Sequence, residues 1–163
     1  MNFLIDVQGN KYNDNNVKTG NLVVSIKTYF MTANILYKGG LRSEATHLGS
    51  GDTIRTDAPK DNHGKGEAFS PTDLLATSLG CCMISIMGIV AMKNNFVFEG
   101  GSAEITKVME ADPRRVGEVI VKINMPKLNF TDEQKKMLET AALNCPVAKS
   151  LSAELKQTVS FAW

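Results

Sequence analysis

The sequence lacks an excess of charge of either sign, because its 163 residues carry 18 basic and 17 acidic side chains. A net charge of +1 creates no long-range field that would guide the chain to nucleic acid or to an anionic membrane surface. The apolar fraction of 43% is ordinary for a globular protein and excludes disorder as the main state. One folded domain, with room for an appendage, is therefore expected.

Cysteine is also scarce, with three residues in the whole chain and two of them adjacent, Cys81 and Cys82. An odd number of cysteines cannot form the fully paired disulfide framework of a small secreted protein. The N-terminal segment places Asp6 in the stretch that would have to be apolar in a signal peptide. These features favour a reducing compartment, and we expect a cytoplasmic protein.

Motifs for metals and nucleotides are missing as well. The two histidines, His47 and His63, form no CxxC or HxxxH spacing with the cysteines, so no metal site is expected. The segment Gly64-Lys65-Gly66 lacks the frame of a phosphate-binding loop, and no GxGxxG follows a strand pattern. We therefore expect no bound cofactor and no nucleic-acid partner.

Charge is absent from Leu74 to Met92, a run of 19 residues that approaches the ~20 required to cross a bilayer. Asp73 and Lys93 bracket the run closely, small and polar side chains dilute it, and no second span follows. Ser70 followed by Pro71 and Asp73 is typical of a helix N-cap with a capping box. The pattern predicts a buried central helix ending at about Lys93, with no membrane partner.

Alternating apolar and polar residues predict strands on both sides of this helix. Residues 1–30, rich in Asn, Gly and Lys, are interpreted as an N-terminal extension (a loose arm or an extra strand) before a main domain at 31–163. Strands are expected at 22–26, 33–38, 41–48, 53–57, 103–109, 117–125 and 158–163, with further helices from 131 and over 147–155. This order predicts an α+β fold in which a mostly antiparallel sheet packs against helices.

Two cysteines lie where a thiol can be reactive. Cys82 is in the middle of the apolar helix, and Cys145 precedes Pro146, which makes Cys145 the expected N-cap of the following short helix. Free backbone N–H groups at such a position favour the thiolate. Cys81 points about 100° around the helix from Cys82 and is interpreted as a small buried hydrophobe.

Two segments carry a family resemblance. The first, GKGEAFSPTDLLATSLGCCMISIMGIV, runs from the helix start to the central cysteines, and the second, AALNCPVAKSL, contains a Cys-Pro-Val signature. With RSEATHLGSGDTIRTDAP upstream, they resemble the OsmC/Ohr superfamily of osmotically inducible and organic hydroperoxide resistance proteins. The resemblance covers residues 33–163 and implies an intertwined homodimer in which a mostly antiparallel sheet packs on two long helices.

The resemblance also implies a thiol-dependent peroxidase that acts on organic hydroperoxides. By position, Cys82 is similar to the family's attacking cysteine, which becomes a sulfenic acid, and Cys145 to the resolving cysteine, which condenses with it to a disulfide. An external dithiol reductant then restores both thiols. The apolar helix around Cys82 favours fatty or aromatic hydroperoxides over small polar ones.

A thiol among apolar side chains ionises poorly without a nearby cation. The family pairs an arginine with a glutamate for this purpose, and Arg42 resembles that arginine, with Arg55 as the alternative. The glutamate position, ten residues before the attacking cysteine, is Thr72 here. Asp73 or Glu67 is therefore the candidate carboxylate partner.

Helix geometry limits how Asp73 could act. Asp73 and Cys82 are nine residues apart on one helix, which separates them by roughly 13 Å. A carboxylate in the first turn can therefore reach a thiol only across an interface with a partner chain, and helix capping alone also accounts for Asp73. Two other hypotheses remain open: a slowly oxidised thiol sensor or disulfide-handling protein, and a non-enzymatic binder of a small hydrophobic ligand.

Overall fold

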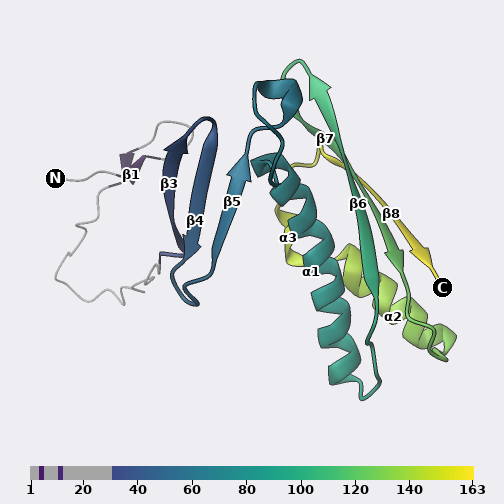
Figure 1. The fold of residues 1–163 in the computed structure, drawn as a ribbon. Coiled ribbons are helices and arrows are strands. Elements are labelled where there is room, and N and C mark those ends of the chain that lie inside the picture. The colour runs from purple at the N-terminus through teal and green to yellow at the C-terminus, as the bar shows by residue number, and fades with distance from the viewer. Residues whose placement is uncertain (1–3, 6–10, 13–30) are drawn as a thin grey trace, which may run out of the picture. The chain divides into compact units, whose positions relative to one another are not determined.

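The computed structural model describes residues 4–5, 11–12 and 31–163 (Figure 1). The chain divides into two compact units, Met1–Met31 and Thr32–Trp163. In the first, β1 Leu4–Ile5 pairs with β2 Lys11–Tyr12, and the strand expected at 22–26 lies outside the described residues. The second contains β3 Ala33–Gly39, β4 Arg42–His47, β5 Thr53–Asp57, η1 Lys60–Asn62, α1 Pro71–Lys93, β6 Ser102–Ala111, β7 Arg114–Asn124, α2 Asp132–Leu143, α3 Pro146–Ser150 and β8 Lys156–Ala162.

The predicted α+β class is confirmed, but the strands of the larger unit form two sheets rather than one. The first has the order β3-β4-β5 and is antiparallel throughout, and the second has the order β6-β7-β8. In the second, β8 runs parallel to β7 because α2 and α3 carry the chain back between them. Of the expected two long helices, α1 has 23 residues, whereas α2 has only 12.

Local sequence signals set the helix ends as predicted. Ser70 caps α1, and both bonds of its capping box with Asp73 are present. Thr131 and Gln134 form the same motif at the start of α2. Cys145 is the N-cap of α3, which stops at Ser150 and is therefore shorter than the helix expected over 147–155.

The core forms where α1 packs against β6 on one side and α2 on another (Figure 1). Gly80 permits the close approach to β6, since a Cβ there would lie 2.4 Å from Cδ1 of Ile105. Leu79, Met83 and Met87 are fully buried on the covered side of α1. By length and composition alone, α1 is long and apolar enough to span a membrane. The core helix of a soluble protein meets the same two criteria.

The β3–β5 sheet has two different faces. Strand register places four residues on one face, Ile35, Tyr37, Ala45 and Ile54. Of these, Ile35 is 73% exposed, Tyr37 63% and Ile54 50%. Arg42 and its cross-strand partner at the end of β5 lie on the other face. Within the part of the chain that the structure describes, no helix or other sheet packs extensively on either face.

Candidate functional site

The two predicted reactive thiols lie against each other in the core. Cys82 is half-buried at the middle of α1, and Cys145, 63 residues later, is fully buried at the start of α3. Cys82 lies close enough to influence the pKa of the Cys145 thiol, and all three cysteines of the chain are free. The fold therefore brings two sulfur atoms together inside an apolar cluster, where they could form and break a disulfide.

The electrostatics of Cys145 differ from the sequence-based expectation. The Ala148 N–H donates to Cys145 Sγ at 3.4 Å, as expected for an N-cap. Burial nevertheless raises the pKa of the Cys145 thiol; this N–H bond opposes the rise, and the neighbouring Cys82 adds to it. The N-cap position is confirmed, but the shift of the Cys145 pKa is opposite to the predicted preference for thiolate, because loss of solvent outweighs the N–H bond.

Cys81 also differs from its prediction. It is exposed rather than buried. A shallow cavity of about 340 Å³ beside it is lined partly by Gly80, Ser85 and Ala103. The interpretation of Cys81 as a buried hydrophobe is therefore corrected.

Arg42 is held by two carboxylates at the charged face of the β3–β5 sheet. Its Nη2 donates to Asp57 Oδ2 at 3.3 Å and also contacts the carboxylate of Glu67, in the loop before α1. Glu67, followed by Asp57, raises the pKa of the Arg42 guanidinium. The alternative arginine, Arg55, is 83% exposed and forms only a 3.8 Å ion pair with Glu44. The structure thus brings Arg42 and Glu67 together and adds Asp57, which the sequence analysis did not identify.

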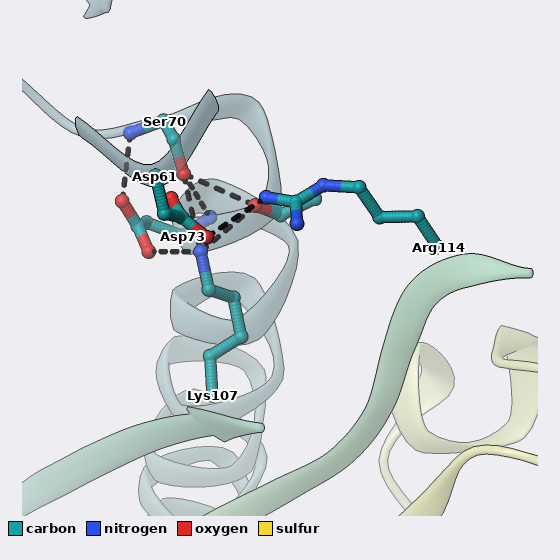
Figure 2. A network of polar contacts seen from close by, with 6 residues as sticks. Asp61, Ser70, Asp73, Lys107 and Arg114 are labelled. Atoms are coloured by element: carbon teal, nitrogen blue, oxygen red, sulfur yellow. Dashed lines mark hydrogen bonds and ion pairs between the residues drawn. The ribbon is translucent and has the colours of Figure 1, made fainter. Parts of the chain in front are cut away.

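Asp73 has a different partner from Arg42. Lys107 on β6 places its Nζ 2.7 Å from Asp73 Oδ1 and donates to Thr72 Oγ1 at 2.8 Å and to Ser70 Oγ at 3.3 Å (Figure 2). Asp73 Oδ2 meanwhile accepts the Ser70 N–H at 2.8 Å. Lys107 gave no signal in the sequence, because it is one residue in an alternating strand and meets α1 only in the folded chain.

A further ion pair fixes the loop that carries Glu67. Arg114 on β7 donates to Asp61 Oδ2 at 3.0 Å (Figure 2). Gly64 is required in the same loop, since a Cβ there would lie 1.7 Å from the carbonyl oxygen of Ala58. The loop is therefore held at both β7 and the end of β5, which limits where Glu67 can go.

The Arg42 cluster and the thiol pair are separate in one chain. Asp57 N–H donates to the Phe69 carbonyl, so the cluster lies beside the first residues of α1, whereas Cys82 is roughly 16 Å further along the helix axis. None of the groups that set the Cys145 pKa is a cation. Among the described residues, no three His, Cys, Asp or Glu side chains cluster as metal ligands do.

Comparison with known proteins identifies relatives. A sequence profile described as OsmC-like protein matches residues 64–160. The structure is similar to that of a proposed osmotic stress induced and detoxification response protein from Psychrobacter arcticus, with 49% identity and a TM-score of 0.78, covering 82% of this chain and 97% of that one. No protein with a curated description matches the sequence significantly.

Two further solved structures share the fold at low identity. An organic hydroperoxide resistance protein OsmC from Legionella pneumophila is 19% identical, with a TM-score of 0.65, covering 83% of this chain and all of that one. The organic hydroperoxide resistance protein OhrB of Bacillus subtilis is 18% identical, with a TM-score of 0.58, covering 80% of this chain and 98% of that one. At these identities the likeness concerns the fold.

The burial and raised pKa of Cys145 predict the order in which the thiols react with a maleimide. Cys145 should be labelled last, at least about tenfold more slowly than Cys81, since its reaction needs both local opening and ionisation. Timed labelling followed by peptide mass spectrometry measures the order. In urea the three rates should converge, and rapid labelling of Cys145 in the native protein would contradict the burial described above.

The Asp73 network predicts a pH-dependent contribution to stability. Burial raises the Asp73 pKa, but bonds from Lys107 and Ser70 outweigh it and hold the pKa below 3.8. The contribution is therefore present above pH 3.8 and lost as the pH falls through the lower folded value. In urea unfolding at pH 7, Asp73→Asn should cost about 1 kcal/mol, because the amide oxygen accepts the Ser70 N–H bond more weakly than the carboxylate does and the partly exposed ion pair adds little.

The control for that experiment is Asp132→Asn, in the first turn of α2, where Gln134 rather than the aspartate makes the capping box. It should stay within about 0.5 kcal/mol of the wild type. A cost of Asp73→Asn that is unchanged at acid pH would contradict the assigned network.

Proposed function

The chain belongs to the OsmC-like protein family, and on this premise we propose that it is a thiol-dependent peroxidase that reduces organic hydroperoxides. The observation that carries the proposal is that Cys82 and Cys145 pack in one apolar cluster, close enough for Cys82 to influence the Cys145 pKa. A sulfenic acid is trapped quickly only when a second thiol is already beside it. Family membership supports a role in peroxide stress, and the thiol pair supplies a mechanism for it.

The reaction proceeds in three balanced steps. The Cys82 thiolate attacks one oxygen of the hydroperoxide, the O–O bond breaks, and the alcohol leaves with a proton while Cys82 becomes a sulfenic acid. The Cys145 thiol then attacks the Cys82 sulfur, forming a disulfide and releasing water. An external dithiol reduces this disulfide by thiol–disulfide exchange and is itself oxidised to a disulfide.

The environment of each thiol fits this division of roles. Cys145 is fully buried and its raised pKa keeps it protonated, which protects it from direct oxidation. Cys82 is only half-buried and is the sulfur that a substrate can reach. Ile86, four residues from Cys82 and therefore on the same face of α1, is apolar, so the preferred hydroperoxides are fatty or aromatic.

We extend the proposal to a homodimer. The exposed apolar face of the β3–β5 sheet and the exposed Leu75, Ile89 and Met92 on α1 are more apolar surface than a monomer ordinarily leaves in water. A second copy of the chain would cover both. Because Arg42 lies near the start of α1 and Cys82 lies along it, each Arg42 would serve the thiol pair of the partner subunit.

The remaining candidate residues take supporting roles in this proposal. Glu67 contacts Arg42 from the loop before α1, and Asp73, bound to Lys107, fixes the start of α1 at the same interface. Three free cysteines fit a reducing cytoplasm, where a dithiol reductant is available.

The peroxidase proposal predicts that Cys82→Ser abolishes dithiol-dependent consumption of cumene hydroperoxide, because the attacking sulfur is lost. Cys145→Ser should instead leave a sulfenic acid on Cys82 that a dimedone probe detects by mass spectrometry. One equivalent of hydroperoxide should convert the wild type to a Cys82–Cys145 disulfide within one turnover.

Cys81→Ser is the matched control, since it removes the adjacent exposed thiol and should retain most of the activity. Slow oxidation of Cys82, with no catalytic consumption of peroxide, would contradict the peroxidase proposal and favour a thiol sensor. No loss of thiols at all would favour a binder of hydrophobic ligands.

The dimer proposal predicts that Ile35→Lys weakens self-association at least about tenfold, since a charge is placed in a desolvated interface. Sedimentation equilibrium at micromolar concentration measures the change. Leu128→Lys, at an exposed apolar residue in the loop after β7, is the control. A wild type that is monomeric throughout this range would contradict the dimer.

A further inference from the structure

Asp57 is a buried carboxylate outside the thiol pair, and the sequence analysis assigned it no role. It is the last residue of β5, is only 1% exposed, and is paired across the ladder with Arg42 on β4. Its Oδ2 accepts from Arg42 Nη2 at 3.3 Å and from the Glu67 N–H at 2.9 Å. Two rigid strands and one loop amide therefore fix its position.

The other oxygen of Asp57, Oδ1, has no hydrogen-bond partner among the described residues. In the part of the chain that the structure describes, Oδ1 is buried and accepts no hydrogen bond. Burying a carboxylate with an unbonded oxygen lowers the stability of the fold. An apolar residue of similar volume would pack the strand at a smaller cost in folding free energy. The free oxygen leaves Asp57 able to accept a second N–H from the planar guanidinium of Arg42.

Glu67 contacts the same guanidinium, but from an exposed position on a loop. Its side chain is 62% exposed and is carried by the loop between β5 and α1. The pKa of Asp57, by contrast, is held below its usual value by the Glu67 N–H against the effect of burial, and Arg42 lowers it further. Asp57 is thus the buried partner fixed by two strands, and Glu67 the partner whose exposed side chain water can detach.

We propose that Asp57 is the positioning residue that holds Arg42 in the orientation needed to act on the thiol, and that Glu67 is a releasable second contact. The inference rests on the proposed role of Arg42 at Cys82. Asp57 itself touches neither the substrate nor the reacting sulfur. It acts through Arg42, whose Nη2 it binds at the end of the sheet.

The direction in which Cys82 reactivity changes when Asp57 is removed distinguishes a positioning role from a purely electrostatic one. If Asp57 acted only by its charge, its removal would leave Arg42 less neutralised and would make Cys82 more reactive. If it positions Arg42, its removal detaches the cation and makes Cys82 less reactive. The difference is visible in the rate at which a haloacetamide alkylates Cys82, because only the thiolate reacts.

The experiment measures the pH profile of Cys82 alkylation by peptide mass spectrometry in the full chain carrying Cys81→Ser. Arg42→Met should slow alkylation at pH 7 about tenfold, the effect of removing one close opposite charge. Asp57→Asn should slow it by a similar factor and move the profile to higher pH. In the Arg42→Met background, Asp57→Asn should then change nothing further.

Glu67→Gln is the matched carboxylate control, and because Glu67 is exposed it also serves if Asp57→Asn does not fold. Its profile should stay within about twofold of the wild type. A tenfold loss with Glu67→Gln, faster alkylation with Asp57→Asn, or a further loss in the double variant would overturn the inference.

Failure of the proposed function has a different outcome. If Arg42→Met leaves the alkylation profile unchanged, the proposed role of Arg42 is wrong, whatever Asp57 does. If the profiles change as expected but the wild type consumes no hydroperoxide, the peroxidase proposal fails while the positioning of Arg42 by Asp57 stands.

Discussion

The packing of α1 is the constraint on which the rest of the structure depends. Its long uncharged run must be covered on more than one side, and β6 and α2 cover two of them. The covered side includes Leu79 and Met83, and the adjoining turn places Cys82 against Cys145 at the start of α3. The contact between two distant thiols is thus a consequence of how one apolar helix is buried.

The buried thiols and the charged Arg42 cluster lie in two different places in the chain. The thiol pair lies in an apolar cluster, where loss of solvent raises the pKa of Cys145. Arg42, the cation proposed to activate the thiol, is on a sheet against which no helix or other sheet of the described chain packs extensively. Within the described part of one chain, the thiol pair has no nearby cation, and Arg42 has no nearby thiol. The peroxidase proposal therefore depends on the dimer proposal.

Sequence patterns predicted those features that depend on neighbours in the chain. The caps at Ser70 and Thr131, the ends of α1 and the N-cap position of Cys145 all follow from residues within three or four positions of each other. The roles of Lys107 and Asp57 depend on strands that meet other elements only after folding, so no local pattern marked them.

The errors have a similar physical origin. A helix that is apolar nearly all round does not reveal which side its own chain leaves uncovered, and Cys81 was therefore predicted to be buried. An N-cap position indicates favourable N–H groups but not the depth of burial, which decided the direction of the Cys145 pKa. The division of the strands into two sheets was not predicted either, because alternation predicts strands but not their partners.

The two carboxylates around Arg42 show how a single arginine can be both fixed and movable. A guanidinium held only by an exposed loop residue such as Glu67 would lose its orientation whenever the loop moved. A guanidinium held only by a buried, fully paired carboxylate could not reorient toward a substrate. Asp57, buried at a strand end with one oxygen still free, keeps Arg42 attached while Glu67 can leave. Such an arrangement needs the rigidity of the sheet, and it explains why a charged residue stands where packing alone would favour an apolar one.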